Sequence, residues 1–417
     1  MLRIAVVLAI ALRLSLILVL GNFRVDDTAT YIAGAQSIAA RGAFLDARGN
    51  PEIFRTPGYP LVLAPFLALH ASDALIVTMN IVFAVLVVIV TWKIARQLFA
   101  DDRVAGVCAL IVAVEPAMLL WSLKVMPETL FTLCLVLFAY AAICEKPIAA
   151  AIALCAAIYV KPIAWPLALL VPFAGVWVRP KQALILLATC IALLAPWHLR
   201  NYATADYVGF SSLMDRSLYI SAGGSVAARE QRVPFAEMRR RLIARDDSRA
   251  ADPKRFAEMR REGVSRVASD PFGWTKTQLF GTFRTLFEPG AAEWARTFGL
   301  YGGGGQSAMV DGGFRRFAQK HPILIAVSIL WAIVLLPLIA LPIAAATHVP
   351  AHSRLAFGLF ALIAIWLVLA GGGVPGYHRF RVPAIPFLVL MSAFVYTPRE
   401  CSFPSPPPAR SQQPSAS

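Results

Sequence analysis

Long apolar runs separated by short polar turns dominate the sequence. Because a helix needs about 20 mostly apolar residues to cross a bilayer, each run is a candidate membrane span. Ten such segments are predicted, near residues 3–20, 73–98, 103–122, 127–144, 147–160, 162–178, 182–199, 321–346, 354–371 and 380–396. The fifth and sixth are short and meet at Lys161-Pro162. The pattern therefore predicts an all-α polytopic membrane protein with about ten transmembrane helices.

The polar segments between these runs divide the chain into parts. The predicted parts are an N-terminal transmembrane module over residues 1–200 with a first outer loop at 21–72, a loop region over 201–320, C-terminal transmembrane helices over 321–397, and a tail over 398–417. Residues 57–70 are apolar but too few to cross a bilayer, so we expect an interfacial helix there. The tail is rich in proline and serine and is expected to be disordered.

Two related pieces stand in the middle of the 201–320 region. Phe235–Arg240 and Phe256–Arg261 both read Phe-Ala-Glu-Met-Arg-Arg, and each opens a basic, helix-favouring stretch. Two copies are too few for a solenoid, so they predict two amphipathic helices that cap the membrane bundle. Gly302–Gly305 is not followed by Lys-Ser or Lys-Thr, which excludes a phosphate-binding P-loop there. We expect this glycine run to be a flexible connector.

The composition agrees with a membrane protein. The chain is 58% hydrophobic and only 15% charged, whereas soluble domains are about one quarter charged. Its formal net charge is +15. The basic residues form no nucleic-acid-binding module, so we expect membrane lipids and lipid phosphates as partners and no nucleic acid. Five of the six cysteines lie within apolar runs and no Cys-x-x-Cys pair occurs, which argues against a disulfide framework or a thiolate metal site.

The charges near the span ends bear on orientation. With the N-terminus inside, residues 21–72, 200–320 and 371–380 face the outside. The first apolar segment lacks a small-residue cleavage site and is interrupted by Arg13, so we interpret it as a retained span. The positive-inside bias of this arrangement is weak, because several cations fall outside. An anionic ligand on that side would account for them.

Charged residues inside or at the ends of apolar helices are costly, so each is a functional candidate. The acidic candidates are Asp26 and Asp27 after the first span and Glu128 at the start of the fourth. Tyr31 and eight basic or imidazole side chains complete the outer group: Arg55, Lys124, Lys161, His198, Arg200, His378, Arg379 and Arg381. The alternative explanations are snorkelling for the arginines near helix ends and a favourable helix-dipole position for Glu128.

Two further charges, Arg13 and Glu115, fall near the middle of their spans. For Arg13 the alternative to a functional role is an internal salt bridge.

Two carboxylates and several cations at a lipid–water boundary fit one chemistry well. A sugar on a polyprenyl phosphate can be transferred to a hydroxyl or amine, and the leaving phosphate would be stabilised by arginine and lysine. A carboxylate would deprotonate the acceptor, while the charge that develops at the anomeric carbon resembles that of glycoside hydrolysis. A lipid-linked donor needs no soluble nucleotide-binding domain, and no Gly-x-Gly-x-x-Gly follows a predicted strand.

These motifs resemble the GT-C fold of integral-membrane glycosyltransferases. The similarity is greatest to family 39, which includes protein O-mannosyltransferases and bacterial aminoarabinose transferases. Members carry an acidic motif in the first outer loop with a tyrosine four residues after the aspartate, and Asp27 and Tyr31 match that spacing. Further similar pieces are Ala33–Gly42 and Arg55–Pro60 as juxtamembrane helices, Val125–Glu128, Ala195–Tyr202 and Arg379–Pro383.

The resemblance implies roles for individual residues. Asp27 takes the role of catalytic base with Asp26 as its neighbour, and the cations before the last span meet the lipid phosphate. Many members have Asp-Glu where this chain has Asp26-Asp27, so either carboxylate can be the base. Some relatives use a divalent metal. Its ligands here would come from Asp27, Glu128, His198 and His378, although their spacing supports no preformed site.

The leading hypothesis is thus a bacterial inner-membrane glycosyltransferase with its active site facing the periplasm. Its donor is a polyprenyl-phosphate-linked sugar, and the acceptor, whether lipid, glycan or protein, is left open. The first alternative is a transporter or flippase of lipid-linked sugars. Transporters usually contain inverted repeats and broken helices; the two halves of this chain show no convincing match, but Arg13 and Glu115 fit that alternative. A non-catalytic membrane scaffold is the second.

Overall fold

The computed structural model describes residues 1–175, 178–249, 254–299, 319, 322–374 and 376–396 of the 417-residue chain. These residues form helices joined by turns, and among them the only β pairing is an isolated bridge between Leu45 and Pro51. The all-α prediction is therefore confirmed. The predictions for Gly302–Gly305 and for the 398–417 tail lie outside the described residues.

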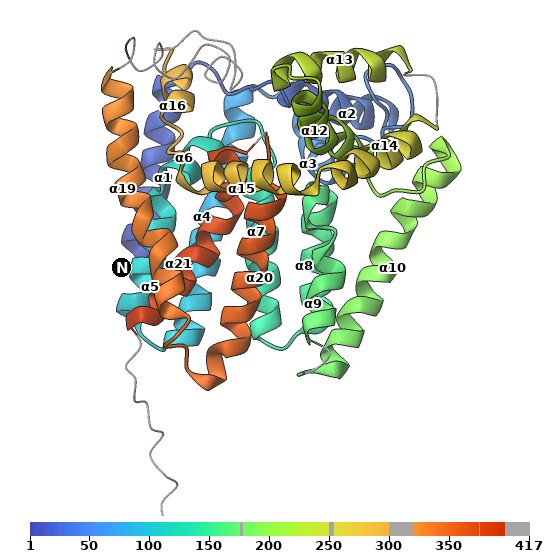
Figure 1. The fold of residues 1–417 in the computed structure, drawn as a ribbon. Coiled ribbons are helices and arrows are strands. Elements are labelled where there is room, and N and C mark those ends of the chain that lie inside the picture. Colours follow the sequence, from blue (N-terminus) through green and yellow to red (C-terminus); the bar gives the residue numbers. More distant parts are fainter. Residues whose placement is uncertain (176–177, 250–253, 300–318, 320–321, 375, 397–417) are drawn as a thin grey trace, which may run out of the picture.

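Every segment predicted to span the membrane is helical, and the bounds agree closely with the apolar runs (Figure 1). The helices are α1 (Leu2–Val19), α4 (Asp73–Phe99), α5 (Asp102–Val114), α6 (Pro116–Ser122), α7 (Glu128–Ile143), α8 (Pro147–Val160), η1 (Pro162–Ala164), α9 (Leu167–Gly175), α10 (Pro180–Ala205), α19 (Pro322–Ala345), α20 (Arg354–Ala370), η4 (His378–Ala384), α21 (Ile385–Ala393) and η5 (Phe394–Tyr396).

The number of spans is smaller when judged by length. Among the described residues, six helices are long and apolar enough to cross a membrane, or seven if the bent pair α5–α6 forms one span. The segments predicted at 127–144, 147–160 and 162–178 form shorter apolar helices. A multi-pass membrane protein is thus supported, while the count of about ten spans is not confirmed.

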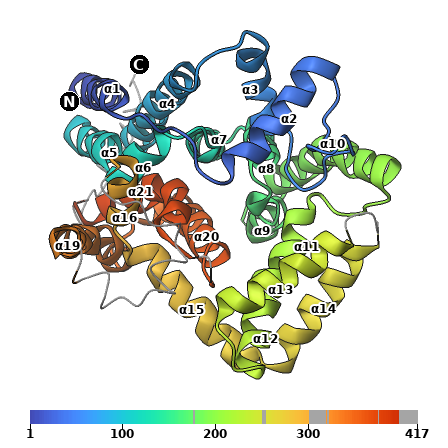
Figure 2. The ribbon, with the colours of Figure 1, turned by 90° about the horizontal axis from the view of Figure 1, so that it is seen from above.

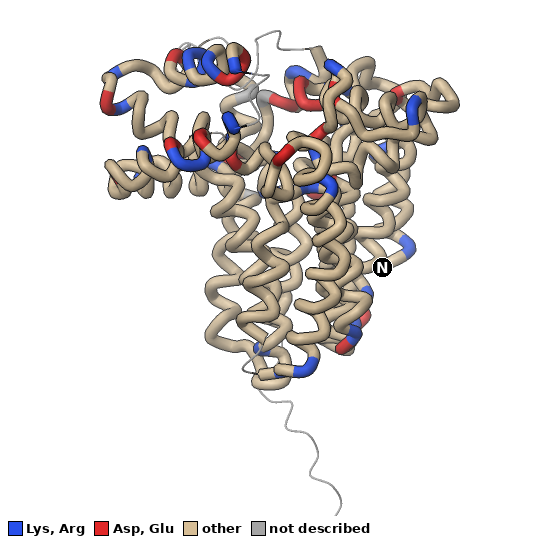
Figure 3. The backbone as a smooth tube through the Cα atoms, turned by 90° about the vertical axis from the view of Figure 1, so that its right-hand side faces the viewer, with Lys and Arg blue, Asp and Glu red and all other residues tan. Residues whose placement is uncertain are grey.

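The outer surface of the bundle also fits a membrane environment. Lys, Arg, Asp and Glu gather mainly at the two ends of the bundle, with few charges between them (Figure 3). Large apolar side chains such as Val82, Ile152 and Ile191 are exposed along its length. Exposed apolar surface on this scale is unfavourable in water but favourable against lipid tails.

A break divides α5 from α6, which meet at an angle of 54°. Pro116 lacks a backbone N–H and prevents a continuous helix, and the side chain of Glu115 caps α6 by accepting a hydrogen bond from the backbone N of Met118 at 2.7 Å. Arg13 donates to the freed carbonyl of Ala113 at 3.0 Å and to Ser122 Oγ at 2.9 Å. It forms no ion pair with a described residue, so backbone and hydroxyl oxygens take the place of the internal salt bridge.

One end of the bundle is covered by further helices, and we call it the capped end (Figures 1 and 2). These helices are α2 (Thr28–Arg41), α3 (Gly58–Ala68), α11 (Ser212–Ser217), η2 (Leu218–Gly223), α12 (Gly224–Glu230), α13 (Phe235–Ser248), α14 (Arg255–Ser269), α15 (Pro271–Phe287) and α16 (Ala291–Thr297). α15 runs across the bundle axis, and α11 to α14 lie on the side away from α1 and α19.

The repeated Phe-Ala-Glu-Met-Arg-Arg motif opens α13 and α14, so the prediction of two helices is confirmed. Its methionines, Met238 and Met259, occupy equivalent positions and are both buried in a small apolar cluster beside the main core. That cluster also contains Tyr219, Leu242 and Phe256. The repeat therefore builds the cap by placing an equivalent apolar face from each helix into one shared core.

Candidate functional site

The acidic residue Asp27 lies where the chain leaves α1 and turns into α2. Its backbone is fixed by the next residue, because Thr28 Oγ1 accepts a hydrogen bond from the Val25 backbone N at 3.0 Å and donates to the Val125 carbonyl at 3.2 Å. These bonds join the first loop to the turn between α6 and α7. The Asp27 side chain is 40% exposed, whereas Asp26 next to it is exposed and has no hydrogen bond to a described residue.

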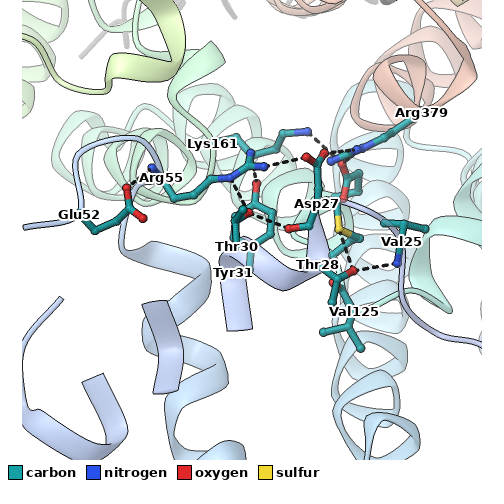
Figure 4. Close-up of polar contacts among 12 residues, drawn as sticks. Val25, Asp27, Thr28, Thr30, Tyr31, Glu52, Arg55, Val125, Lys161 and Arg379 are labelled. Atoms are coloured by element: carbon teal, nitrogen blue, oxygen red, sulfur yellow. Dashed lines mark hydrogen bonds and ion pairs between the residues drawn. The ribbon is translucent and has the colours of Figure 1, made fainter. Parts of the chain in front are cut away.

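Two arginines from distant parts of the sequence hold the carboxylate of Asp27 (Figure 4). Arg55 Nη2 donates to Oδ1 at 2.8 Å, and Arg379 Nη1 donates to Oδ2 at 2.7 Å. Burial raises the pKa of Asp27, but the charges of Arg379 and Arg55 and their hydrogen bonds lower it more, so the pKa falls below its ordinary value. The group is therefore an ionised carboxylate at neutral pH.

Arg55 is itself fixed before it reaches Asp27. Its Nε donates to Thr30 Oγ1 at 2.9 Å, and its guanidinium lies 4.5 Å from the centre of the Tyr31 ring. The Glu52 carboxylate accepts the backbone N–H groups of Phe54 and Arg55, which shapes the turn that leads into α3. The Tyr31 ring on α2 thus holds the Arg55 guanidinium in place through a cation–π contact.

Glu128 is the second carboxylate of the site and is completely buried at the first position of α7. Its Oε1 accepts from Lys161 Nζ at 3.0 Å and from Arg379 Nε. Arg379 therefore bridges the two carboxylates, Asp27 and Glu128. Its guanidinium carbon also lies 5.1 Å from the centre of the Trp121 ring. Glu128 Oε2 has no hydrogen-bond partner among the described residues.

A cavity of about 600 Å³ opens in front of this cluster. Its inner wall carries Asp27, Tyr31, Arg55, Lys161 and Arg379. The other walls come from α15, the end of α20, and the cap helices α11 and α13, and include Trp274, Gln278, Trp366, Met214, Arg216, Arg239 and Ile243. Apolar groups make up most of the lining, so the cavity combines an apolar interior with a charged wall at the boundary between bundle and cap.

The wall formed by α15 depends on close backbone packing. Gly281 faces the turn after α20, and an added Cβ there would lie 1.7 Å from the carbonyl oxygen of Gly373. Only glycine permits this approach, and Gly371, Gly372 and Gly373 of this turn line the cavity.

Two of the predicted residues near the last span lie behind the cavity. Arg381 Nη1 donates to the carbonyls of Thr285, Leu286 and Glu288, where α15 ends and helical carbonyls lack partners. His378 is buried, with Nδ1 3.8 Å from Glu288 Oε1. Neither His378 nor Arg381 lines the cavity.

The local helix type explains this division. The segment His378–Ala384 is a 3₁₀ helix, in which residues three apart share a face. His378 and Arg381 therefore point to α15, and Arg379 between them points to the cavity.

Three more predicted residues serve other contacts. Arg200 donates to the carbonyls of Glu52 at 2.6 Å and Phe44 at 2.9 Å, so it holds the first loop against α10. His198 Nδ1 lies 3.1 Å from the Val208 carbonyl. Lys124 is buried in the turn before α7, where its Nζ donates to the Asn22 carbonyl at 3.0 Å. None of the three lines the cavity.

The four residues considered as metal ligands are not gathered together. Asp27 and Glu128 share Arg379, whereas His198 lies on α10 and His378 lies on the face of η4 that packs against the end of α15. Within the part of the chain that the structure describes, no three His, Cys, Asp or Glu side chains group as metal ligands.

Several lining residues were missed by the sequence reasoning. Trp274, Gln278 and Trp366 stand in amphipathic or apolar helices and carry no local signal that separates them from packing residues. Arg216 and Arg239 were hidden among many basic residues of the cap region, although Arg239 belongs to the repeated motif.

Comparison with known protein families finds no family model that matches the chain, and comparison with curated proteins finds no match either. The resemblance to membrane glycosyltransferases therefore rests on the motifs of this sequence.

Proposed function

We propose that this chain is a membrane glycosyltransferase. It moves a sugar from a polyprenyl-phosphate-linked donor to an acceptor at the extracytoplasmic face of a bacterial inner membrane. The observation that carries the proposal is the ionised Asp27 between Arg55 and Arg379 in a largely apolar cavity at the end of an apolar bundle. Lipid-linked donors would bring an apolar chain and an anionic phosphate to this boundary.

The basic residues of the inner wall would bind the donor phosphate. Arg55, Lys161 and Arg379 supply planar and point-charge donors for its oxygens. In the transfer step the acceptor oxygen forms a bond to the anomeric carbon, and the bond from that carbon to the phosphate oxygen breaks. The polyprenyl phosphate leaves with the electron pair, and the cations stabilise the charge that it gains.

Asp27 would accept the proton of the acceptor hydroxyl. Held by two arginines, the carboxylate has a lowered pKa and is a weak base. When a phosphate oxygen replaces Asp27 as a partner of Arg55 or Arg379, the pKa of Asp27 rises and the group becomes a better base. Donor binding would thus activate the base. Asp27 lines the cavity and Asp26 does not, which favours Asp27 for this role.

The test is transfer in proteoliposomes with a panel of radiolabelled polyprenyl-phosphate sugars. We expect Asp27→Asn to lower turnover by at least about 10²-fold, the usual effect of losing a general base, while the protein stays folded and inserted. Asp26→Asn is the matched control and should keep wild-type turnover. Full turnover by Asp27→Asn would show that the base is assigned wrongly, and an unbroken glycosidic bond with every donor would reject the enzyme.

A flippase of lipid-linked sugars is the second candidate function, and the broken helix α5–α6 favours it. Broken helices commonly form transport sites, and the break holds the buried Glu115, whose Oε1 has no hydrogen-bond partner among the described residues. In that case wild type would move intact lipid-linked sugar across the bilayer, and Glu115→Gln would slow this flux. Unchanged flux in the variant would count against transport.

A further inference from the structure

A second basic region of the cavity lies on the cap helices, which form its outer wall. Arg216 from α11 and Arg239 from α13 line this outer wall together with Met214, Leu218 and Ile243. Arg216 is paired with Asp246 at 2.7 Å. Arg239 is exposed and forms no ion pair or hydrogen bond with a described residue.

The repeated motif makes the state of Arg239 informative. Arg239 and Arg260 are the same position of the two Phe-Ala-Glu-Met-Arg-Arg copies. Arg260 is neutralised by Asp215, with bonds of 2.7 and 2.9 Å, whereas Arg239 faces the cavity. The acidic residue of its own copy, Glu237, pairs with Arg240 and Arg241 instead. One copy therefore uses this arginine to hold the cap together, and the other leaves its charge in the cavity.

The balance of charges in the whole cavity also leaves Arg239 without a compensating carboxylate. Five basic side chains line it: Arg55, Lys161, Arg216, Arg239 and Arg379. Three carboxylates contact them, Asp27, Glu128 and Asp246. Two positive charges stay uncompensated, one within the inner cluster and one at Arg239. A single donor phosphate on the inner wall would leave the outer one unmatched.

We infer that the outer wall is an anion subsite for the acceptor, which carries a phosphate or carboxylate group beside an apolar portion. This inference rests on the proposed function, because the donor phosphate occupies the inner wall. Arg239 makes the charged contact, Arg216 contributes beside it, and Met214, Leu218 and Ile243 contact the apolar portion. A guanidinium binds either anion through two parallel hydrogen bonds.

The binding test does not depend on catalysis. The full chain is reconstituted in nanodiscs of neutral lipid and titrated with dodecyl phosphate, and in a second arm with dodecanoate. We expect wild type to bind two phosphate groups per chain. Arg239→Gln should weaken one of them by about tenfold, as expected for losing a charged hydrogen bond, and Arg239→Lys should recover part of the affinity.

Arg261→Gln is the matched control, because Arg261 is exposed on α14, outside the cavity, and the substitution removes the same charge. It should bind as wild type does. An Arg239→Gln protein that binds both probes as wild type does would overturn the inference. If only dodecyl phosphate binds more weakly to Arg239→Gln, the anion of the acceptor is a phosphate, and if only dodecanoate does, it is a carboxylate. If neither probe binds more weakly to the variant, the subsite is rejected.

A transfer assay separates this inference from the proposed function. With an acceptor available in charged and neutral forms, Arg239→Gln should raise KM for the charged form only and leave kcat unchanged. Transfer without any such preference would support the enzyme and reject the subsite. Binding that depends on Arg239 without any transfer would support the subsite and reject the enzyme.

Discussion

The charged side chains on the two faces of η4 contact different kinds of partner. On the cavity face, Arg379 bridges Asp27 and Glu128 and stands where a substrate can reach it. On the other face, Arg381 and His378 contact the end of α15, where Arg381 holds three backbone carbonyls. The cations are neighbours in the sequence, but only Arg379 lines the cavity.

The difference teaches that a basic residue before the last span does not by itself indicate phosphate binding. Arg381 satisfies carbonyls at a helix C-terminus, which is a favourable place for a cation because of the helix dipole. Arg379 pairs with Asp27, a carboxylate in the cavity wall whose place a ligand phosphate can take. The kind of partner separates the two arginines: Arg381 binds backbone carbonyls and holds the fold, whereas Arg379 binds a carboxylate in the cavity wall, which is a partner that a ligand can displace.

The largest effect is expected when the cavity face is broken. Arg379→Met removes the bridge between Asp27 and Glu128 and, under the proposed function, one contact to the donor phosphate, so turnover should fall by about 10³-fold. The variant should also be less stable by about 3 kcal/mol, because it leaves the buried Glu128 with fewer partners. Transfer assays and thermal unfolding in detergent measure the two effects. Arg354→Met, at an exposed position of α20, is the control, and wild-type turnover by Arg379→Met would contradict the assignment.

Breaking the opposite face should change stability before activity. Arg381→Met leaves the buried carbonyls at the end of α15 without donors, at a cost of about 3 kcal/mol. We expect a lower unfolding midpoint, while the kcat of the protein that stays folded remains close to the wild-type value. A variant with wild-type stability and lost turnover would place Arg381 with Arg379 and remove the contrast between the faces.

Much of the fold could be predicted because apolar length and helical structure are local properties. The ten apolar runs correspond to helices within a few residues, and the two copies of the repeated motif open α13 and α14. The number of spans could not be fixed in the same way. α7, α8 and α9 are apolar but short, and whether such helices cross a membrane depends on their neighbours as well as on their own composition.

The candidate site was predictable in part. Asp27, Arg55 and Glu128 could be singled out by their positions at helix ends, but no sequence signal joins Arg379 to both carboxylates over such long separations. The contrast between Arg379 and Arg381 depends on a 3₁₀ helix, whereas the sequence places Arg379 in the predicted outer turn at 371–380 and Arg381 at the start of the predicted span at 380–396. Arg239 could not be singled out from the sequence, because it occupies the same position of the repeated motif as Arg260. Only the three-dimensional position of Asp215, which pairs with Arg260, distinguishes the two copies.

The smallest expected effect concerns Lys124, a cation that belongs to neither face of η4. Burial, only partly opposed by the charge of Glu293, lowers the pKa of Lys124 to about 8 from its ordinary 10.5. Below pH 8 the charged amine is buried in the folded protein and destabilises it. Between pH 8 and 10.5 the folded state loses this proton while the unfolded state keeps it, so stability increases with pH through this window.

Lys124→Met removes that dependence. In detergent, the unfolding midpoint of wild type should rise by roughly 2 °C relative to the variant between pH 7.5 and 9.5. Lys276→Met, at an exposed position of α15, should keep the wild-type pH dependence. If the difference between wild type and Lys124→Met stayed constant over this range, the buried amine would not titrate there. Lys124 would then be charged at every pH used, stabilised by a partner stronger than the Asn22 carbonyl. That result would make Lys124 a further basic residue fixed by its partners, as Arg381 is.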